Sequence, residues 1–129
     1  RVKLPYLDSL TDDRVKIAAL YSKLLNGVGD IVVPFILNGA KHVFHLYVVR
    51  TSKRDELARF LNDRGIGTSI HYPIPPHLQE AYKDLNYKKG DFPIAEELAL
   101  TSLSLPLFPG MTKGQIELVV KSIKSFFDE

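Results

Sequence analysis

The chain has 129 residues, of which 45% are hydrophobic and 25% are charged, and this is the size and composition of one globular domain with its own core. The 17 Lys and Arg against 15 Asp and Glu give a net charge of +2, so charge gives no reason to expect a nucleic acid or a membrane surface as partner. The absence of Cys excludes a disulfide scaffold, a Cys-based zinc site and a cysteine nucleophile.

The start of the chain shows no signal-peptide pattern and no apolar run long enough to span a bilayer. The first residue is Arg1, and the only Met is Met111. We therefore expect the natural polypeptide to be longer than this sequence.

The first forty residues predict a helix followed by an edge strand. Thr11 is a candidate N-cap, apolar residues then recur at helical spacing, and Asn26-Gly27 supplies a stop, so we expect a helix over residues 11–26. Residues 31–36 are β-prone, but Pro34 cannot donate to a strand ladder. This segment is therefore expected at a sheet edge or at the end of a strand.

The middle of the chain predicts a strand, a helix and another strand. Residues 43–49 are apolar on both faces, as is typical of a central strand. Ser52 and Asp55 have capping-box spacing, and Gly65 lies where a left-handed helix stop is expected, so a helix should lie between them. Residues 68–72 should form a third strand.

The last third predicts two short helices, a short strand and a closing helix. We expect helices over residues 77–82 and 94–100 and a strand around residues 102–105. Thr112 and Gln115 form a second capping-box pattern, which opens the final amphipathic helix. The order of elements predicts an α+β fold, in which a small mixed or antiparallel sheet packs against helices.

Several motifs that carry chemistry are incomplete. Gly27-Val28-Gly29 and Gly65-Ile66-Gly67 both lack the third glycine of a dinucleotide-binding loop. His42 and His45 are three residues apart on a predicted strand, so their side chains should point to opposite faces, and we expect no metal site.

Other polar residues also give no catalytic pattern. Glu96 and Glu97 are adjacent on a predicted helix and point about 100° apart, which suits a solvated face better than an acid/base pair. Ser69 and Ser104 are available hydroxyls, but the sequence places no base beside either of them.

The segment from Gly67 to His77 is the unusual part of the sequence. A predicted strand runs into a turn with three prolines, and the segment carries His71, Tyr72 and His77. Proline lowers the entropy cost of holding a turn, and His and Tyr offer hydrogen-bonding groups together with flat apolar faces. The combination suits a sugar or a phosphorylated ligand, and it equally suits a Pro-rich connection whose aromatic ring packs in the core.

Six segments, taken in order, resemble the C-terminal part of the DegT/DnrJ/StrS sugar aminotransferases. They are Arg1–Leu25, Val43–Val49, Arg54–Leu57, Leu61–Thr68, His71–Gln79 and Leu103–Thr112. The resemblance covers nearly the whole chain, and the ordered motifs together are specific although each alone is weak.

The resemblance implies a type I aminotransferase fold and a cytoplasmic homodimer that uses pyridoxal phosphate (PLP). Such enzymes transfer an amino group, usually from glutamate, to a keto-sugar on a nucleoside diphosphate, in amino-sugar and polysaccharide biosynthesis. Because the lysine and the aspartate that hold PLP lie in the family's large N-terminal domain, residues 1–129 are expected to be the small C-terminal domain, with residues 1–27 as the helix that leads out of the large one. The resemblance thus implies no catalytic, cofactor-binding or metal-binding residue in this chain, an inactive fragment, and substrate contacts from His71, Tyr72 and His77.

Two alternatives stay open. A related PLP- or pyridoxamine phosphate-dependent sugar dehydratase would have the same domain and would differ at the cofactor lysine, outside this sequence. A free-standing α+β ligand-binding module without catalysis is the second alternative.

Overall fold

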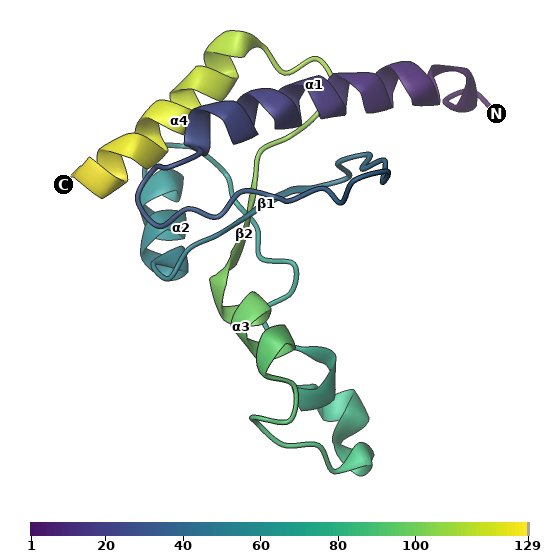
Figure 1. Cartoon of the computed structure of the whole chain (residues 1–129), viewed down its shortest axis with the longest axis vertical. Helices are drawn as coiled ribbons and strands as arrows, with labels where there is room; N and C mark the ends of the chain where they lie inside the picture. Colours follow the sequence, from purple (N-terminus) through teal and green to yellow (C-terminus); the bar gives the residue numbers. More distant parts are fainter. Residues whose placement is uncertain (129) are drawn as a thin grey trace.

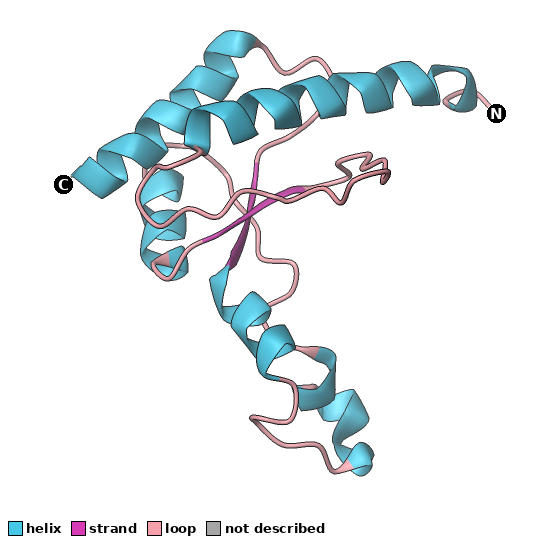
Figure 2. Cartoon of the chain, viewed as in Figure 1, coloured by secondary structure: helices cyan, strands magenta, loops and turns pink. Residues whose placement is uncertain are grey.

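The computed structural model describes residues 1–128 as a body of helices on a small sheet, with a lobe that extends from the body (Figure 1). Helices dominate and the strands are short (Figure 2), which confirms the predicted α+β class. None of the helices in this range combines the length and the apolar character that a membrane span requires. In chain order the elements are the 3-10 helix η1 (Leu4–Tyr6), α1 (Leu7–Leu25), β1 (Tyr47–Arg50), α2 (Arg54–Asn62), the 3-10 helices η2 (Pro76–Leu78) and η3 (Glu80–Leu85), α3 (Pro93–Thr101), β2 (Ser102–Leu105) and α4 (Lys113–Asp128).

The sheet consists of β1 and β2 with one further bridge on each side. The two strands pair antiparallel, with Val48 opposite Ser104. Val32 forms a bridge with Arg50 beside β1, and Ser69 forms a bridge with Ser104 beside β2. Both strands are therefore central, as predicted for the first of them.

The two outer segments are shorter than predicted. Residues 31–36 and 68–72 each contribute one bridge rather than a full strand. Pro34 in the first segment and Pro73 directly after the second have no N–H to donate to a strand ladder.

The strand predicted over residues 43–49 begins only at Tyr47. Phe44 has a φ of 46°, which lies outside the β region, and this turn sends its side chain into the core. The Phe44 N–H donates to His42 Nδ1 at 3.0 Å. From Tyr47 onward the strand alternates, and Tyr47 and Val49 are fully buried.

The core joins the sheet to α1, α2 and α4, and α4 packs against both other helices. The Tyr21 ring of α1 stacks on the Tyr47 ring of β1 with centroids 5.0 Å apart. The Tyr21 hydroxyl donates to the Pro106 carbonyl at 3.0 Å, and Tyr47 shares a 2.9 Å hydrogen bond with Ser22. Burial raises the pKa of both tyrosines, so both act as neutral, hydrogen-bonded core residues.

The predicted start of the first helix is wrong, and that of the last helix is confirmed. α1 begins at Leu7, so Thr11 is not its N-cap; the preceding turn η1 contains Pro5, whose fixed φ favours helical conformation before that point. The capping box of α4 is confirmed, since Thr112 N donates to Gln115 Oε1 at 2.9 Å and Gln115 N donates to Thr112 Oγ1 at 3.3 Å.

The capping box predicted at Ser52 and Asp55 is wrong. Ser52 donates its N–H (2.8 Å) and its hydroxyl (2.6 Å) to Asp30 Oδ2, and the Thr51 hydroxyl donates to the other oxygen of Asp30. α2 then begins at Arg54 without a side-chain cap. Asp30, far away in the sequence, has taken the partners that local spacing assigned to Asp55.

Residues 71–101 form the projecting lobe, which carries η2, η3 and α3 and lies below the sheet in Figure 1. The helix predicted over residues 77–82 is replaced by two 3-10 helices. The helix predicted over residues 94–100 is confirmed as α3, and the strand predicted at residues 102–105 is confirmed as β2.

Candidate functional site

The candidate site lies where the 71–101 lobe joins the sheet. The bridge between Ser69 and Ser104 fixes the backbone just before the Pro-rich turn. His71 follows two residues later, and its Nδ1 lies 2.9 Å from Ser104 Oγ. Tyr72 is 73% exposed and packs edge-on against the His71 ring at 5.6 Å. The pairing of strands therefore places both rings at the edge of the sheet.

His71 and Tyr72 line a cavity of about 270 Å³ between the Pro-rich turn and α3. Its wall is mostly apolar, and its polar groups come from the two rings, from Gln79 and from Ser102. A volume near the lower end of the range for small-molecule sites accommodates part of a ligand, such as one sugar ring. The lining residues are His71, Tyr72, Ile74, Pro75, Pro76, Gln79, Ala95, Leu98, Ala99 and Ser102.

His77 lies behind this cavity and not on its wall. Its Nε2 lies 3.0 Å from Glu96 Oε1, and its side chain is only 7% exposed. The ring also packs against Phe92 at 4.8 Å. His77 thereby ties η2 to α3, and the third predicted site residue supports the turn that carries the other two.

Glu96 is the centre of this support. Its Oε1 accepts the N–H of Gly90 at 2.7 Å and the N–H of Phe92 at 3.4 Å, in addition to the contact with His77. The Gly90 hydrogen bond, with help from His77, lowers the pKa of the Glu96 carboxyl. The prediction of a solvated Glu96 is therefore wrong, whereas Glu97 is exposed and pairs with Arg50.

Ser104 and Glu96 are the residues that sequence reasoning missed. The sequence placed no base beside Ser104, whereas in the structure His71 contacts its hydroxyl. Ser104 lies between Leu103 and Leu105 on a predicted strand, and a polar side chain at a buried strand position requires a partner. A serine between two leucines on a predicted strand was therefore the sequence pattern that could have identified Ser104.

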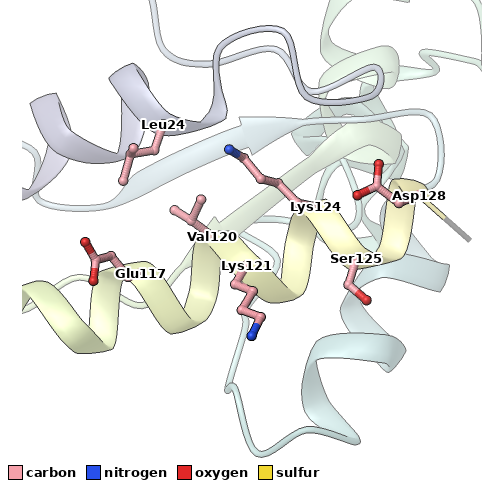
Figure 3. Close-up of a pocket in the computed structure, with 7 residues that line it drawn as sticks. All are labelled: Leu24, Glu117, Val120, Lys121, Lys124, Ser125 and Asp128. Atoms are coloured by element: carbon pink, nitrogen blue, oxygen red, sulfur yellow. The ribbon is translucent and has the colours of Figure 1, made fainter.

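A larger hollow of about 440 Å³ lies between α1 and α4 (Figure 3). Leu24 and Val120 form its apolar part, and Lys121 and Lys124 extend in different directions from α4 (Figure 3). Its charged groups do not converge on one point, so this groove offers no defined ligand position.

The histidines outside the lobe form no ligand cluster either. His42 accepts a backbone hydrogen bond and its ring packs at a tilt against Phe44 at 4.3 Å, and His45 is exposed. Over residues 1–128, no group of three or more His, Asp or Glu side chains is arranged to hold a metal ion.

Comparisons with known proteins agree with the predicted resemblance. The model of the DegT/DnrJ/EryC1/StrS aminotransferase family matches residues 1–124. A pleiotropic regulatory protein of Geobacillus stearothermophilus is 48% identical over 98% of this chain and 34% of its own length. A dTDP-3-amino-3,4,6-trideoxy-alpha-D-glucose transaminase of Streptomyces venezuelae is 38% identical over 98% of this chain and 33% of its own length.

Solved structures agree in fold as well. The crystal structure of S. venezuelae DesV in complex with a ketimine intermediate superposes with a TM-score of 0.96 at 37% identity, over 100% of this chain and 35% of that one. A family aminotransferase from Brucella abortus gives a TM-score of 0.88 at 31% identity, over 98% and 34% of the two chains. The chain spans about a third of the length of the curated relatives it matches.

Proposed function

The chain belongs to the DegT/DnrJ/EryC1/StrS aminotransferase family, and from this premise we propose that it is the C-terminal small domain of a PLP-dependent aminotransferase that acts on a nucleotide-linked keto-sugar. One observation carries the proposal. Nearly the whole chain matches one third of relatives that include named dTDP-amino-sugar transaminases. The remaining two thirds of such a protein would hold the other parts of the active site.

In this proposal residues 1–129 are one domain, and residues 1–27 lead out of the large domain. The exposed apolar side chains near the N-terminus support it. Leu4, Tyr6 and Leu7 are 69%, 62% and 51% exposed, and an apolar group of this kind is typical of a surface that another part of a protein covers.

The residues around the cavity do not by themselves fit PLP. The cofactor serves as an electron sink and requires a lysine and an acidic partner for its ring nitrogen, and the cavity wall at His71 contains neither a lysine nor a carboxylate. We therefore propose that the large domain holds the cofactor and that this chain contributes to the substrate side.

We assign the substrate contacts to His71 and Tyr72, with His77 holding the turn. The two exposed rings offer an imidazole nitrogen and a phenol hydroxyl above an apolar wall, and a sugar has the matching combination of oxygens and a less polar ring face. The short Pro-rich turn between the sheet and η2 holds these groups at little entropic cost, which favours binding.

His71→Ala in the full-length enzyme tests the assignment. Loss of a hydrogen bond to a charged ligand group costs about 1.5–3 kcal/mol, so we expect the KM for the keto-sugar to rise roughly tenfold or more. The half-reaction with the amino donor should change little. His45→Ala is the matched control, since His45 is exposed and away from the cavity. Equal losses in both half-reactions together with lower thermal stability would show that His71 is structural.

A second experiment tests the division of labour between the domains. The 129-residue chain, mixed with PLP, an amino donor and a keto-sugar, should show neither the absorbance of a lysine-bound cofactor nor turnover. Appearance of both would contradict the proposal.

The proposal extends to glutamate as amino donor, to a homodimer and to the cytoplasm, all of which follow from the family resemblance. Product analysis with the full-length protein separates the alternatives. An amino-sugar supports the aminotransferase, a dehydrated sugar indicates the dehydratase, and ligand binding without a product indicates a non-catalytic module.

A further inference from the structure

We infer that Ser104 is a positioning residue that holds His71 in its Nε2–H tautomer, so that the cavity presents a hydrogen-bond donor to an oxygen acceptor of the ligand. The inference rests on the proposed function, because it takes His71 as the residue that meets the ligand. Ser104 itself does not line the cavity.

The hydroxyl of Ser104 is held in one place by the sheet. Ser104 N donates to the Ser69 carbonyl at 2.8 Å, and Ser69 N donates to the Ser104 carbonyl at 3.2 Å. On its other side Ser104 pairs with Val48 of β1. The residue is only 5% exposed, and its Oγ lies 2.9 Å from His71 Nδ1. β1 on one side and the bridge to Ser69 on the other thus fix the backbone of the residue whose hydroxyl contacts the ring.

The direction of this hydrogen bond follows from the inventory of partners. Within residues 1–128 the Ser104 hydroxyl has no hydrogen-bond partner other than His71 Nδ1. If Nδ1 carried the proton, the hydroxyl hydrogen of Ser104 would be buried without an acceptor, which is unfavourable. If Ser104 donates, both groups are satisfied. Nδ1 of the neutral ring is then the acceptor, and the proton lies on Nε2.

This tautomer selects the chemistry of the ligand. Nε2 of His71 has no partner among the described residues, and the ring lies on the cavity wall. An Nε2–H group pairs with a phosphoryl or carbonyl oxygen and does not pair with a ligand N–H or ammonium group. We therefore expect an acceptor oxygen of the nucleotide-sugar, and not its amino group, to lie against His71.

Kinetics in the full-length enzyme test whether Ser104 acts through His71. Ser104→Ala should raise the KM for the nucleotide-sugar about three- to tenfold with a smaller change in kcat, because the ring then samples both tautomers. In a His71→Ala background the same substitution should have no further effect. Ser69→Ala is the control, since it keeps the backbone bridge and its side chain is exposed. Equal effects of Ser104→Ala in both backgrounds would overturn the inference.

Substitutions at His71 test the donor directly. A Gln side chain can place an N–H near the position of Nε2, whereas the shorter Asn reaches only the position of Nδ1. We expect His71→Gln to retain a KM closer to that of the unmodified enzyme than His71→Asn does. The reverse order would contradict a donor at Nε2.

A readout independent of activity completes the test. In the 129-residue chain labelled with ¹⁵N-histidine, the neutral His71 ring should give a protonated, pyrrole-like Nε2 signal and a pyridine-like Nδ1 signal, and Ser104→Ala should shift both toward averaged values. A protonated Nδ1 would overturn the inference. By contrast, an unchanged KM in His71→Ala would overturn the substrate-binding role in the proposed function, so the two failures are distinguishable.

Discussion

Arg54 joins the body to the candidate site, and its replacement by Met should weaken the fold measurably. Arg54 opens α2, yet its side chain is only 8% exposed. Its guanidinium donates to the carbonyl of Ala99 at 3.1 Å and lies 3.5 Å from the carbonyl of Ser102. These carbonyls belong to the end of α3 and the start of β2, and both residues line the cavity beside His71. Arg54 therefore caps the helix that forms the cavity wall.

The expected magnitude follows from the partners that Arg54→Met would leave. Met keeps most of the volume of the buried Arg54 stem, so little packing is lost. The substitution removes a charged hydrogen bond and leaves a buried carbonyl without its partner, and we expect the free energy of unfolding to fall by about 2–3 kcal/mol. Asp55, which lies 2.6 Å from Arg54 Nε, is 69% exposed and stays solvated after the substitution. Arg54 Nε has no hydrogen-bond partner, so its contact with Asp55 is an ion pair without hydrogen-bond geometry. Loss of this ion pair should add little to the destabilisation.

Arg50→Met is the matched control. Arg50 forms an ion pair with Glu97 at 3.2 Å, and both side chains are substantially exposed, so its loss should cost about 0–1 kcal/mol. Urea unfolding followed by circular dichroism measures both variants against the unmodified chain. If Arg54→Met costs no more than Arg50→Met, the capping role assigned to Arg54 is refuted.

Two further predictions concern the lobe and the body. The Gly90 hydrogen bond lowers the pKa of the Glu96 carboxyl in the folded chain. The unfolded chain therefore binds a proton at Glu96 more readily than the folded chain does. The free energy of unfolding should fall as the pH drops through the lowered pKa of this carboxyl. Thermal unfolding between neutral and acid pH should show a component that Glu96→Gln removes, and an unchanged pH profile in that variant would contradict the role. Gly29 has a φ of 53°, and an added Cβ would lie 2.2 Å from the Phe127 ring, whereas Gly27 has a φ of 77° and open space around it. Gly29→Ala should therefore destabilise more than Gly27→Ala, whose cost is about 1–2 kcal/mol of backbone strain, and equal melting temperatures for the two variants would disprove the steric conflict.

Features that rest on local pattern were predictable from the amino-acid sequence. The α+β class, the strand over residues 102–105 and the capping box at Thr112 and Gln115 were predictable, because each depends on periodicity or on residues three positions apart. The family was also predictable, since its motifs occur in order along nearly the whole chain. The segment around His71 was identifiable as a candidate site for the same reason.

The contacts between polar groups distant in the sequence follow from the folded arrangement of the chain. Asp30 displaced Asp55 as the partner of Ser52, Glu96 became a partly buried hydrogen-bond centre, and the Ser104 hydroxyl came to contact His71. The last two residues are 33 positions apart in the sequence, and no local rule joins them. Strand pairing brings them together, and burial then requires that each polar group find a partner. The orientation of the proposed binding group is therefore a property of the assembled sheet, because a buried hydroxyl and not a neighbouring residue fixes it.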